Sequence, residues 1–194
     1  EDISIMAGVS PNEDSYFGTS VFRHAKNRSL WLMLLMLSAT VTGEILGYYE
    51  DAMAVMPVLI TFIPMLMGTG GNCGSQSSTL VIRGLAVGEI EFKDIFRVIF
   101  KEIRIALIVG LLLSAVNGIR IYLMYEQNLM LALALGVTMI AVVAMAKCIG
   151  CILPLLAKKL GLDPAIMAAP LITTILDTCT ILVYFNIVTA FFHI

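Results

Sequence analysis

The chain has 194 residues, of which 59% are hydrophobic and 13% are charged, and its formal net charge is −2. Soluble domains usually contain about 25% charged residues and roughly 45–50% apolar ones, so this composition excludes an ordinary soluble globular domain. The net charge is uninformative about partners, and it gives no basic patch for nucleic acid. The apolar residues gather in blocks of about 20, the length that a helix needs to cross a bilayer. We therefore predict an all-α membrane protein that crosses the membrane several times.

Five apolar blocks follow one another along the chain, and each predicts one transmembrane helix. They cover residues 30–49, 52–67, 103–125, 129–156 and 165–192. Basic residues gather before the first block, between the second and third, and between the fourth and fifth, and they are nearly absent from the other two connections. By the positive-inside rule, this alternation places the N-terminus in the cytoplasm and the C-terminus outside. The basic residues are Arg23, Lys26, Arg28, Arg83, Lys93, Arg97, Lys101, Arg104, Lys158 and Lys159.

The second block continues into a stretch rich in glycine, 68-GTGGNCGSQSS-78. It lacks the GK[ST] ending of a phosphate-binding loop and the third glycine of GxGxxG, so a nucleotide site is disfavoured. Gly70 and Gly74 fit the small-xxx-small pattern that lets membrane helices approach closely. Asn72 and Gln76 lie four residues apart, so their amides share one helix face. Two interpretations remain open at this point: tight helix packing alone, or packing combined with the lining of a pore.

The last block carries a carboxylate, Asp177, in the middle of 171-LITTILDTCTILVYF-185. A charged Asp at the centre of a membrane helix costs about 2.5–3.5 kcal/mol on insertion scales, and no basic residue in 165–192 offsets it. Such an acid is by default an ion ligand, a proton relay or a counter-ion. The alternative is a protonated Asp that donates a hydrogen bond to a neighbouring helix. We favour the functional interpretation.

Oxygen atoms surround Asp177 on the same helix face. Thr173 and Ala169 lie four and eight residues before it, and Pro170, as a residue inside a helix, would release the carbonyl of residue 166. A carboxylate, hydroxyls and released carbonyls form the oxygen-only surface that hard cations such as Mg²⁺ and Ca²⁺ prefer. This face is therefore a candidate site for a divalent cation.

Catalysis has no support in the sequence, and we predict that the protein is not an enzyme. The two histidines, His24 and His193, lie near the ends of the chain, and no pair of nearby carboxylates suggests hydrolysis. Cys148 and Cys151 form a CxxC, but no second CxxC or nearby His accompanies it, so we interpret the pair as small apolar helix residues. Lys147 is the deepest basic residue in the blocks, and the sequence offers no explanation for it.

Three segments together resemble the MgtE family of magnesium channels and transporters. The run 64-PMLMGTGGNCGSQSSTLVIRGLAVGEI-90 is similar to the family signature, with its proline, GGNxGxQ and RGLAxGE. The run 161-GLDPAIMAAPLITTILDTCTILVYF-185 resembles the family's last helix, and 16-YFGTSVFRHAKNRSLWL-32 resembles its basic entry to the first helix. The resemblance covers nearly the whole chain.

This resemblance implies a homodimer with five transmembrane helices per subunit and a pore between the subunits. Asp177 would bind Mg²⁺ as the transported ion, and Thr173 and the carbonyl of Ala169 would line its approach. The cytoplasmic half of the pore would be lined by Asn72, Gln76 and Gly71. The protein would lie in the cell's inner (plasma) membrane.

Full-length family members also carry a cytoplasmic N-terminal domain and a pair of CBS domains that sense Mg²⁺ and gate the pore. Those regulatory domains are missing from this chain, which opens at Glu1 without a Met, so we expect a piece of a longer protein. Residues 1–29 would be the end of a cytoplasmic connecting or amphipathic helix, and residues 30–194 the five-helix pore domain. The chain would then be the pore without its gating control.

Two functions compete with the pore. In a proton- or sodium-coupled transporter of divalent cations, Asp177 would titrate during each cycle. In a membrane scaffold without transport, Asp177 would only join helices to one another. We prefer selective permeation of Mg²⁺, largely because of the family resemblance. The dimer that it implies would set two carboxylates beside a two-fold axis, which balance a divalent but not a monovalent ion in a low dielectric.

Overall fold

The computed structural model describes residues 5–7, 16–125, 128–167 and 169–193, and this part of the chain is built from helices joined by short turns. Five helices have 24 or more residues. One short α-helix and three 3-10 helices, labelled η, lie at the connections. The elements are α2 (Val21–Tyr48), α3 (Glu50–Val55), η1 (Pro57–Phe62), α4 (Ile63–Ala86), η2 (Phe92–Asp94), α5 (Ile95–Met124), α6 (Leu129–Lys159), η3 (Pro164–Met167) and α7 (Ala169–Phe192).

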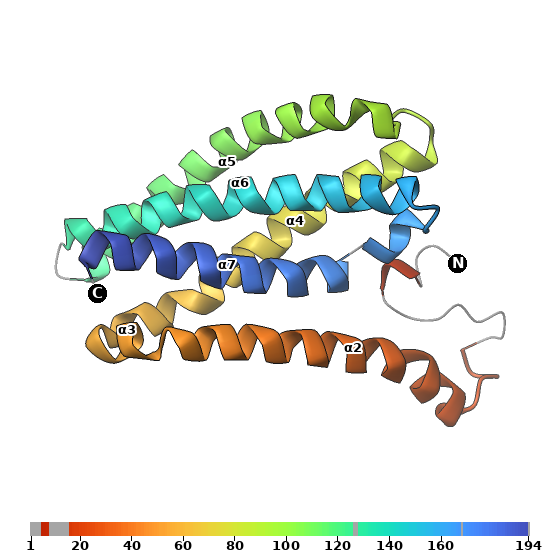
Figure 1. Ribbon diagram of the computed structural model, residues 1–194, viewed down its shortest axis with the longest axis horizontal. Helices are drawn as coiled ribbons and strands as arrows, with labels where there is room; N and C mark the ends of the chain where they lie inside the picture. Colours follow the sequence, from red (N-terminus) through yellow and green to blue (C-terminus); the bar gives the residue numbers. More distant parts are fainter. Residues whose placement is uncertain (1–4, 8–15, 126–127, 168, 194) are drawn as a thin grey trace.

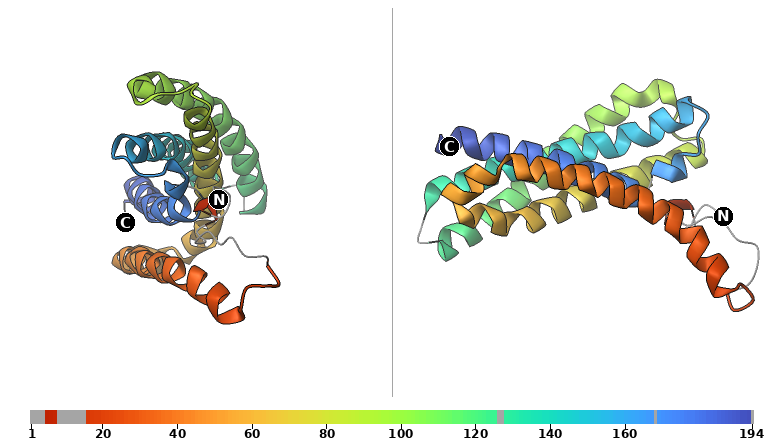
Figure 2. Two further views of the ribbon diagram at one scale, coloured as in Figure 1. Left: turned by 90° about the vertical axis from the view of Figure 1, so that its right-hand side faces the viewer. Right: turned by 60° about the horizontal axis from the view of Figure 1, so that its bottom comes forward.

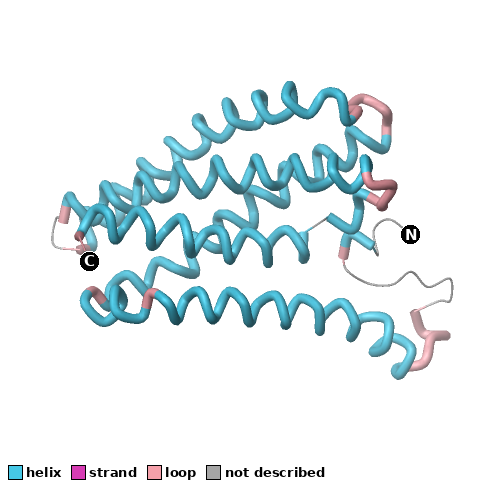
Figure 3. Tube along the Cα trace, viewed as in Figure 1, coloured by secondary structure: helices cyan, strands magenta, loops and turns pink. Residues whose placement is uncertain are grey.

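The five long helices run back and forth along one axis (Figure 1). Helices α2, α5 and α7 begin at the end of the molecule where α4 and α6 stop, and the opposite end holds α3 and the start of α4. The views of Figure 2 show the same alternation, with α2 set apart at one side of the bundle. The chain thus traverses the bundle five times, and the loops and turns between the long helices lie at its two ends (Figure 3).

Three of the described helices are long and apolar enough to cross a membrane, namely Val21–Tyr48, Leu129–Lys159 and Pro170–Phe192. Helices α4 and α5 have 24 and 30 residues, so they are long enough as well. Helix α4 carries the polar 68–78 stretch, whereas α5 is apolar over most of residues 106–123. A membrane crossing by α4 and α5 remains a prediction, and it is supported by the way both helices reach from one end of the bundle to the other.

Helix α5 is longer than its apolar block. We expected the transmembrane segment to begin at residue 103, and the helix begins at Ile95. Hydropathy marks only the part of a helix that lies in hydrocarbon, whereas helix formation continues into the polar region as long as backbone hydrogen bonds can form. The additional turns of α5 carry the basic residues that were expected on the cytoplasmic side.

Glycines end α4 and α6 at the same end of the bundle. Gly88 and Gly161 both have a φ of 73°, a left-handed conformation that a residue without Cβ adopts at little cost. Each follows a helix C-terminus, which is the usual place for such a glycine. At the other end of α6, the Asn128 side chain accepts a hydrogen bond from Leu131 N at 2.9 Å and so caps the helix start.

The core of the bundle lies where α4 crosses α6 and α7. Leu66, Val143 and Leu176 have no exposed surface there. Glycines permit the close crossing: a Cβ on Gly150 would lie 2.4 Å from the carbonyl oxygen of Gly74. A Cβ on Gly74 would lie 2.2 Å from a methyl carbon of Leu176. The structure therefore uses the small residues of the 68–78 stretch for close helix packing.

Candidate functional site

Asp177 lies half-buried on α7, in the apolar part of the bundle. Within the described residues its carboxylate has no hydrogen-bond or ion-pair partner. A charged carboxylate without a partner in an apolar setting is strongly unfavourable unless it takes up a proton, or water, an ion or another chain reaches it. The structure thus leaves the one acid of this helix open to a partner from outside the chain.

Thr173 lies one turn before Asp177 and is half-buried as well. Its hydroxyl donates to the carbonyl of Pro170 at 3.0 Å, and the hydroxyl of Thr174 donates to the same carbonyl at 2.9 Å. The oxygen of Thr173 therefore keeps a fixed orientation on the Asp177 face. Ala169 is the first residue of α7, so its backbone carbonyl lies at the beginning of this face.

Pro170 does not release a carbonyl inside a helix, and that expectation was wrong. Pro170 is the second residue of α7, and residue 166 belongs to the separate helix η3. Proline is well tolerated in the first turn of a helix, because the amide it lacks would have no partner there. The apolar run from Pro164 onward concealed the break between η3 and α7.

Helix α4 presents a polar groove on its outer side. The groove has a volume of about 610 Å³, and Asn72 and Gln76 are exposed in it. Ser75 and Thr79 line it too and were not singled out from the sequence. The spacing of three and four residues between these positions is the helical signal that would have found them. The full lining is Asn72, Ser75, Gln76, Thr79 and Leu80.

The groove adjoins the Asp177 face of α7 through a contact at Gly71. Gly71 is buried, and a Cβ on it would lie 3.0 Å from the Cγ2 methyl carbon of Thr173. Gly71 therefore lies where α4 packs against α7. It precedes Asn72 of the groove, and its neighbour Thr173 lies one helical turn before Asp177. The carboxylate itself is not among the residues that line the groove.

One chain offers few ligands to a metal ion. The described residues contain no group of three or more His, Cys, Asp or Glu side chains that could hold one together. Cys148 and Cys151 are free thiols on α6. Mg²⁺ keeps several of its waters and is bound through only one or two carboxylates, and Asp177 is the one carboxylate of α7.

A second polar cluster is buried between α4, α5 and α6. The Ser77 hydroxyl donates to Oε2 of Glu102 at 2.6 Å, and the Lys147 ammonium donates to the Ser77 oxygen at 3.3 Å. Lys147 Nζ lies 3.7 Å from Glu102 Oε2, and the two side chains are 7% and 9% exposed. This cluster explains Lys147, which the sequence left without an interpretation.

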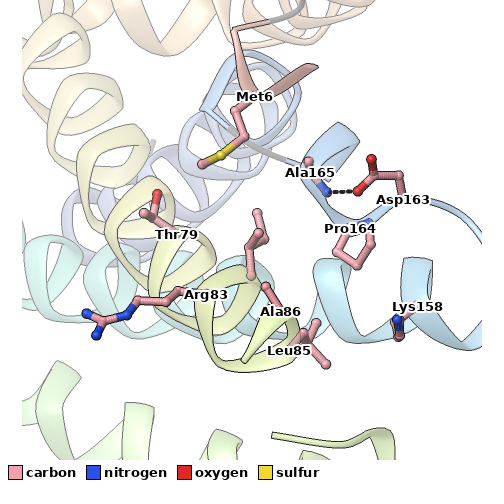
Figure 4. A pocket seen from close by; sticks show the side chains of 10 residues that line it. Met6, Thr79, Arg83, Leu85, Ala86, Lys158, Asp163, Pro164 and Ala165 are labelled. Atoms are coloured by element: carbon pink, nitrogen blue, oxygen red, sulfur yellow. Dashed lines mark hydrogen bonds between the residues drawn. The ribbon is translucent and has the colours of Figure 1, made fainter. Parts of the chain in front are cut away.

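A pocket of about 440 Å³ lies at the end of the bundle where α4 and α6 stop (Figure 4). Arg83 and Lys158 line it, and Figure 4 shows the Arg83 guanidinium pointing away from Asp163. The Asp163 carboxylate accepts a hydrogen bond from Ala165 N at 2.8 Å. Thr79 lines both this pocket and the groove on α4, so the two hollows adjoin.

Known proteins resemble the chain along most of its length. Residues 63–187 match the MgtE family model, which is described as a divalent cation transporter. The chain is 36% identical over 185 residues to the magnesium transporter MgtE of Bacillus subtilis, covering 95% of this chain and 41% of the relative. It is also 36% identical over 160 residues to the magnesium transporter MgtE of Thermus thermophilus, covering 82% and 35%.

A third relative, the magnesium transporter MgtE of Enterococcus faecalis, is 33% identical over 193 residues, covering 98% of this chain and 41% of the relative. The chain thus spans 35–41% of the length of these curated relatives. The family match covers all of α4, α5 and α6 and the part of α7 that holds Asp177. Together these matches show that the chain belongs to the MgtE family of divalent cation transporters.

Proposed function

We propose that the chain is the transmembrane part of a homodimeric pore that conducts Mg²⁺, with Asp177 of each subunit as an ion ligand. The observation that carries this proposal is the half-buried Asp177 carboxylate, which has no partner among the described residues. One turn before it, Thr173 packs against Gly71 of α4, the residue that precedes Asn72 of the polar groove. The names of the relatives, all magnesium transporters, support Mg²⁺ as the transported ion.

The charge of the ion explains why two copies of Asp177 would select a divalent cation. Two carboxylates across a two-fold axis carry two negative charges, which one Mg²⁺ balances. A single monovalent cation would leave one negative charge uncompensated, and in a low dielectric that residual charge is costly. Because Mg²⁺ gives up its waters reluctantly, the oxygens of Thr173 and of the Ala169 backbone would contact the waters around the ion.

A route toward the cytoplasm continues from Asp177 along α4. Asn72 and Gln76 would face the passing ion, with Gly71 holding α4 against α7 at the start of the groove. The groove leads through Thr79 to the pocket that contains Asp163. Amide oxygens, hydroxyls and a carboxylate along this route are ligands that suit a hydrated hard cation.

The membrane arrangement belongs to the same proposal. Helices α2, α4, α5, α6 and α7 would be the five crossings, with residues 1–29 as the end of a cytoplasmic connecting segment and 30–194 as the pore domain. Arg83 and Lys158 line one pocket at a single end of the bundle, and the positive-inside rule assigns that end to the cytoplasm. The longer protein would lie in the inner (plasma) membrane. It would also carry the cytoplasmic regulatory domains.

Mg²⁺ uptake into liposomes tests the proposal. The purified protein is reconstituted with a Mg²⁺-sensitive dye inside the vesicles, and the wild type is compared with Asp177→Asn. We expect uptake to fall at least about tenfold, because losing an interaction of ~1.5–3 kcal/mol changes an equilibrium tenfold to hundredfold. Glu50→Gln is the matched control, since it removes an exposed carboxylate at the start of α3.

Two results would contradict the proposal. Equal uptake by the wild type and Asp177→Asn would show that the ion passes elsewhere. Uptake driven by a pH gradient in the absence of a Mg²⁺ gradient would instead favour a proton-coupled transporter in which Asp177 titrates.

A further inference from the structure

The buried cluster of Ser77, Glu102 and Lys147 joins three helices at one point. Ser77 belongs to α4, Glu102 to α5 and Lys147 to α6. The Ser77 hydroxyl donates to Glu102 and accepts from Lys147, so it lies between the two charges. The cluster is separate from Asp177, and none of its three residues lines the groove on α4.

A buried ion pair is an expensive way to hold helices together. Moving two charges out of water costs more free energy than their attraction usually returns, so packed apolar residues of similar size often give equal or higher stability. In a membrane protein, apolar residues could occupy positions 77, 102 and 147 instead. The ion pair therefore points to a role in geometry, because charge pairs and hydrogen bonds specify direction where apolar contacts do not.

Two neighbouring serines fix α4 from different sides. Ser77 binds the charge pair of α5 and α6, and the Ser78 hydroxyl donates to the carbonyl of Met167 in η3 at 2.7 Å. One turn earlier, Gly74 touches the backbone of Gly150. Successive residues of a helix are about 100° apart around its axis. At this spacing Gly74, Ser77 and Ser78 lie on the side of α4 opposite the groove, so their contacts fix that side of the helix.

We propose that the Glu102–Lys147 pair, acting through Ser77, sets the rotation of α4 and so aims the Asn72 and Gln76 side chains into the ion path. This inference rests on the proposed pore function. Glu102 and Lys147 are positioning residues, since they touch neither the groove nor the ion. A small rotation of α4 would move Gln76 out of line with the path while leaving the bundle folded.

The first experiment replaces the ion pair by apolar residues of similar size, Glu102→Leu together with Lys147→Met. This double variant keeps the packing and removes the directional contacts. We expect it to fold, and we expect the Mg²⁺ concentration for half-maximal uptake to rise by about tenfold, because binding geometry tolerates shifts of much less than 1 Å. Thr138→Val is the control: its buried hydroxyl donates only to the Ala134 carbonyl of its own helix.

The reversed pair, Glu102→Lys together with Lys147→Glu, tests whether charge pairing causes the effect. Ser77 can donate to one and accept from the other in either arrangement, so at least about half of the wild-type uptake is expected to return. Ser77→Ala removes only the bridging hydroxyl and keeps both charges. The double variant Glu102→Leu, Lys147→Met is called the apolar pair. We expect Ser77→Ala, like the apolar pair, to raise the Mg²⁺ concentration for half-maximal uptake, but by a smaller factor.

A readout without Mg²⁺ separates this inference from the pore proposal. In a background without the four native cysteines, Gln76→Cys is labelled by a charged, water-soluble thiol reagent. We expect the apolar pair to change this labelling rate by roughly threefold or more, since a rotated α4 presents position 76 differently to water. A cysteine at exposed Glu50 reports reagent access alone.

The outcomes are distinct. If the wild type takes up no Mg²⁺ but the labelling rate still changes, the pore proposal fails and the positioning of α4 stands. If the apolar pair folds with wild-type labelling and wild-type half-saturation, the positioning inference is overturned. It is also overturned if the apolar pair is impaired and the folded reversed pair recovers nothing, because packing at these positions would then be the cause.

Discussion

Two regions of the bundle hold ionisable groups away from water, and they treat those groups in opposite ways. Glu102 is matched by Lys147 and Ser77 within the same chain. Asp177 has no matching group among the described residues. A charge that the chain neutralises itself serves the fold, whereas a charge that it leaves open marks the place where something from outside must join. The contrast supports the proposal that Asp177 is the ion ligand.

The largest effect is expected in the matched region, which is the buried cluster of Ser77, Glu102 and Lys147. Lys147→Met leaves the buried Glu102 carboxylate without its counter-charge, and removing one partner of a buried pair costs about 3–5 kcal/mol. We expect the free energy of unfolding in detergent to fall by that amount. Lys101→Met is the control, because Lys101 is an exposed neighbour of Glu102 on α5, and changes at exposed sites stay within about 0.5 kcal/mol. Similar losses in both variants would show that Glu102 does not depend on Lys147.

The next largest effect is expected in the open region, which is the Asp177 carboxylate and its surroundings on α7. Mg²⁺ that binds the folded protein raises its stability by about 2.7 kcal/mol at a hundredfold excess over the dissociation constant. We expect this stabilisation in the wild type and its loss in Asp177→Asn, measured as unfolding against Mg²⁺ concentration. Lys147→Met, where enough folded protein can be obtained, should keep the Mg²⁺-dependent increase. If Asp177→Asn is stabilised as strongly as the wild type, the ion binds elsewhere.

A smaller effect is expected at the close crossing of α4 and α6, one turn from Ser77. Gly150→Ala places a Cβ against the backbone of Gly74, so α4 and α6 must separate, and overpacking of this kind costs about 1–3 kcal/mol. Gly118→Ala is the control, because a Cβ there meets nothing within 4 Å. Thermal unfolding of both variants measures the difference. Equal stability would mean that the crossing relaxes without cost.

The smallest effect lies next to the open region. The hydroxyls of Thr42 and Thr178 are 2.6 Å apart and join α2 to α7 beside Asp177. Hydrogen bonds between membrane helices contribute about 0.6 kcal/mol on average, so Thr42→Val should lower the free energy of unfolding by that amount. Thr40→Val is the control, since the Thr40 hydroxyl donates to its own helix at Met36. A double-mutant cycle with Thr178→Val isolates the pair.

The helices and the open region could be predicted from local patterns. Apolar blocks marked the approximate positions of four long helices, but the second block, 52–67, was wrong: most of it forms α3 and η1, and the long helix is α4 (Ile63–Ala86). The helical spacing of three and four residues placed Thr173 beside Asp177 and Asn72 beside Gln76. These features depend on residues within two turns of one another. Helix ends were less accurate: the apolar run across η3 concealed the start of α7 at Ala169, so the interpretation of Pro170 was wrong.

The matched region could not be predicted, because its partners are far apart in the chain. Ser77 lies 25 residues from Glu102 and 70 residues from Lys147. Nothing in the local pattern of α6 indicates which helix will face Lys147. Only the tertiary arrangement brings the three side chains together, so a deep lysine in a membrane helix remains ambiguous until its neighbours are known.

The isolation of α2 has a consequence for the way the chain assembles. Only 6% of the apolar window of α2 is buried inside the protein, and its main packing partner is α7. During synthesis α2 emerges first among the long helices and α7 last. Helix α2 must therefore persist as an independent lipid-solvated helix until the rest of the chain has been inserted, as the two-stage view of membrane folding allows. The low burial of α2 leaves most of its apolar surface for lipid or for a second subunit, and its packing against α7 can form only after α7 has been made.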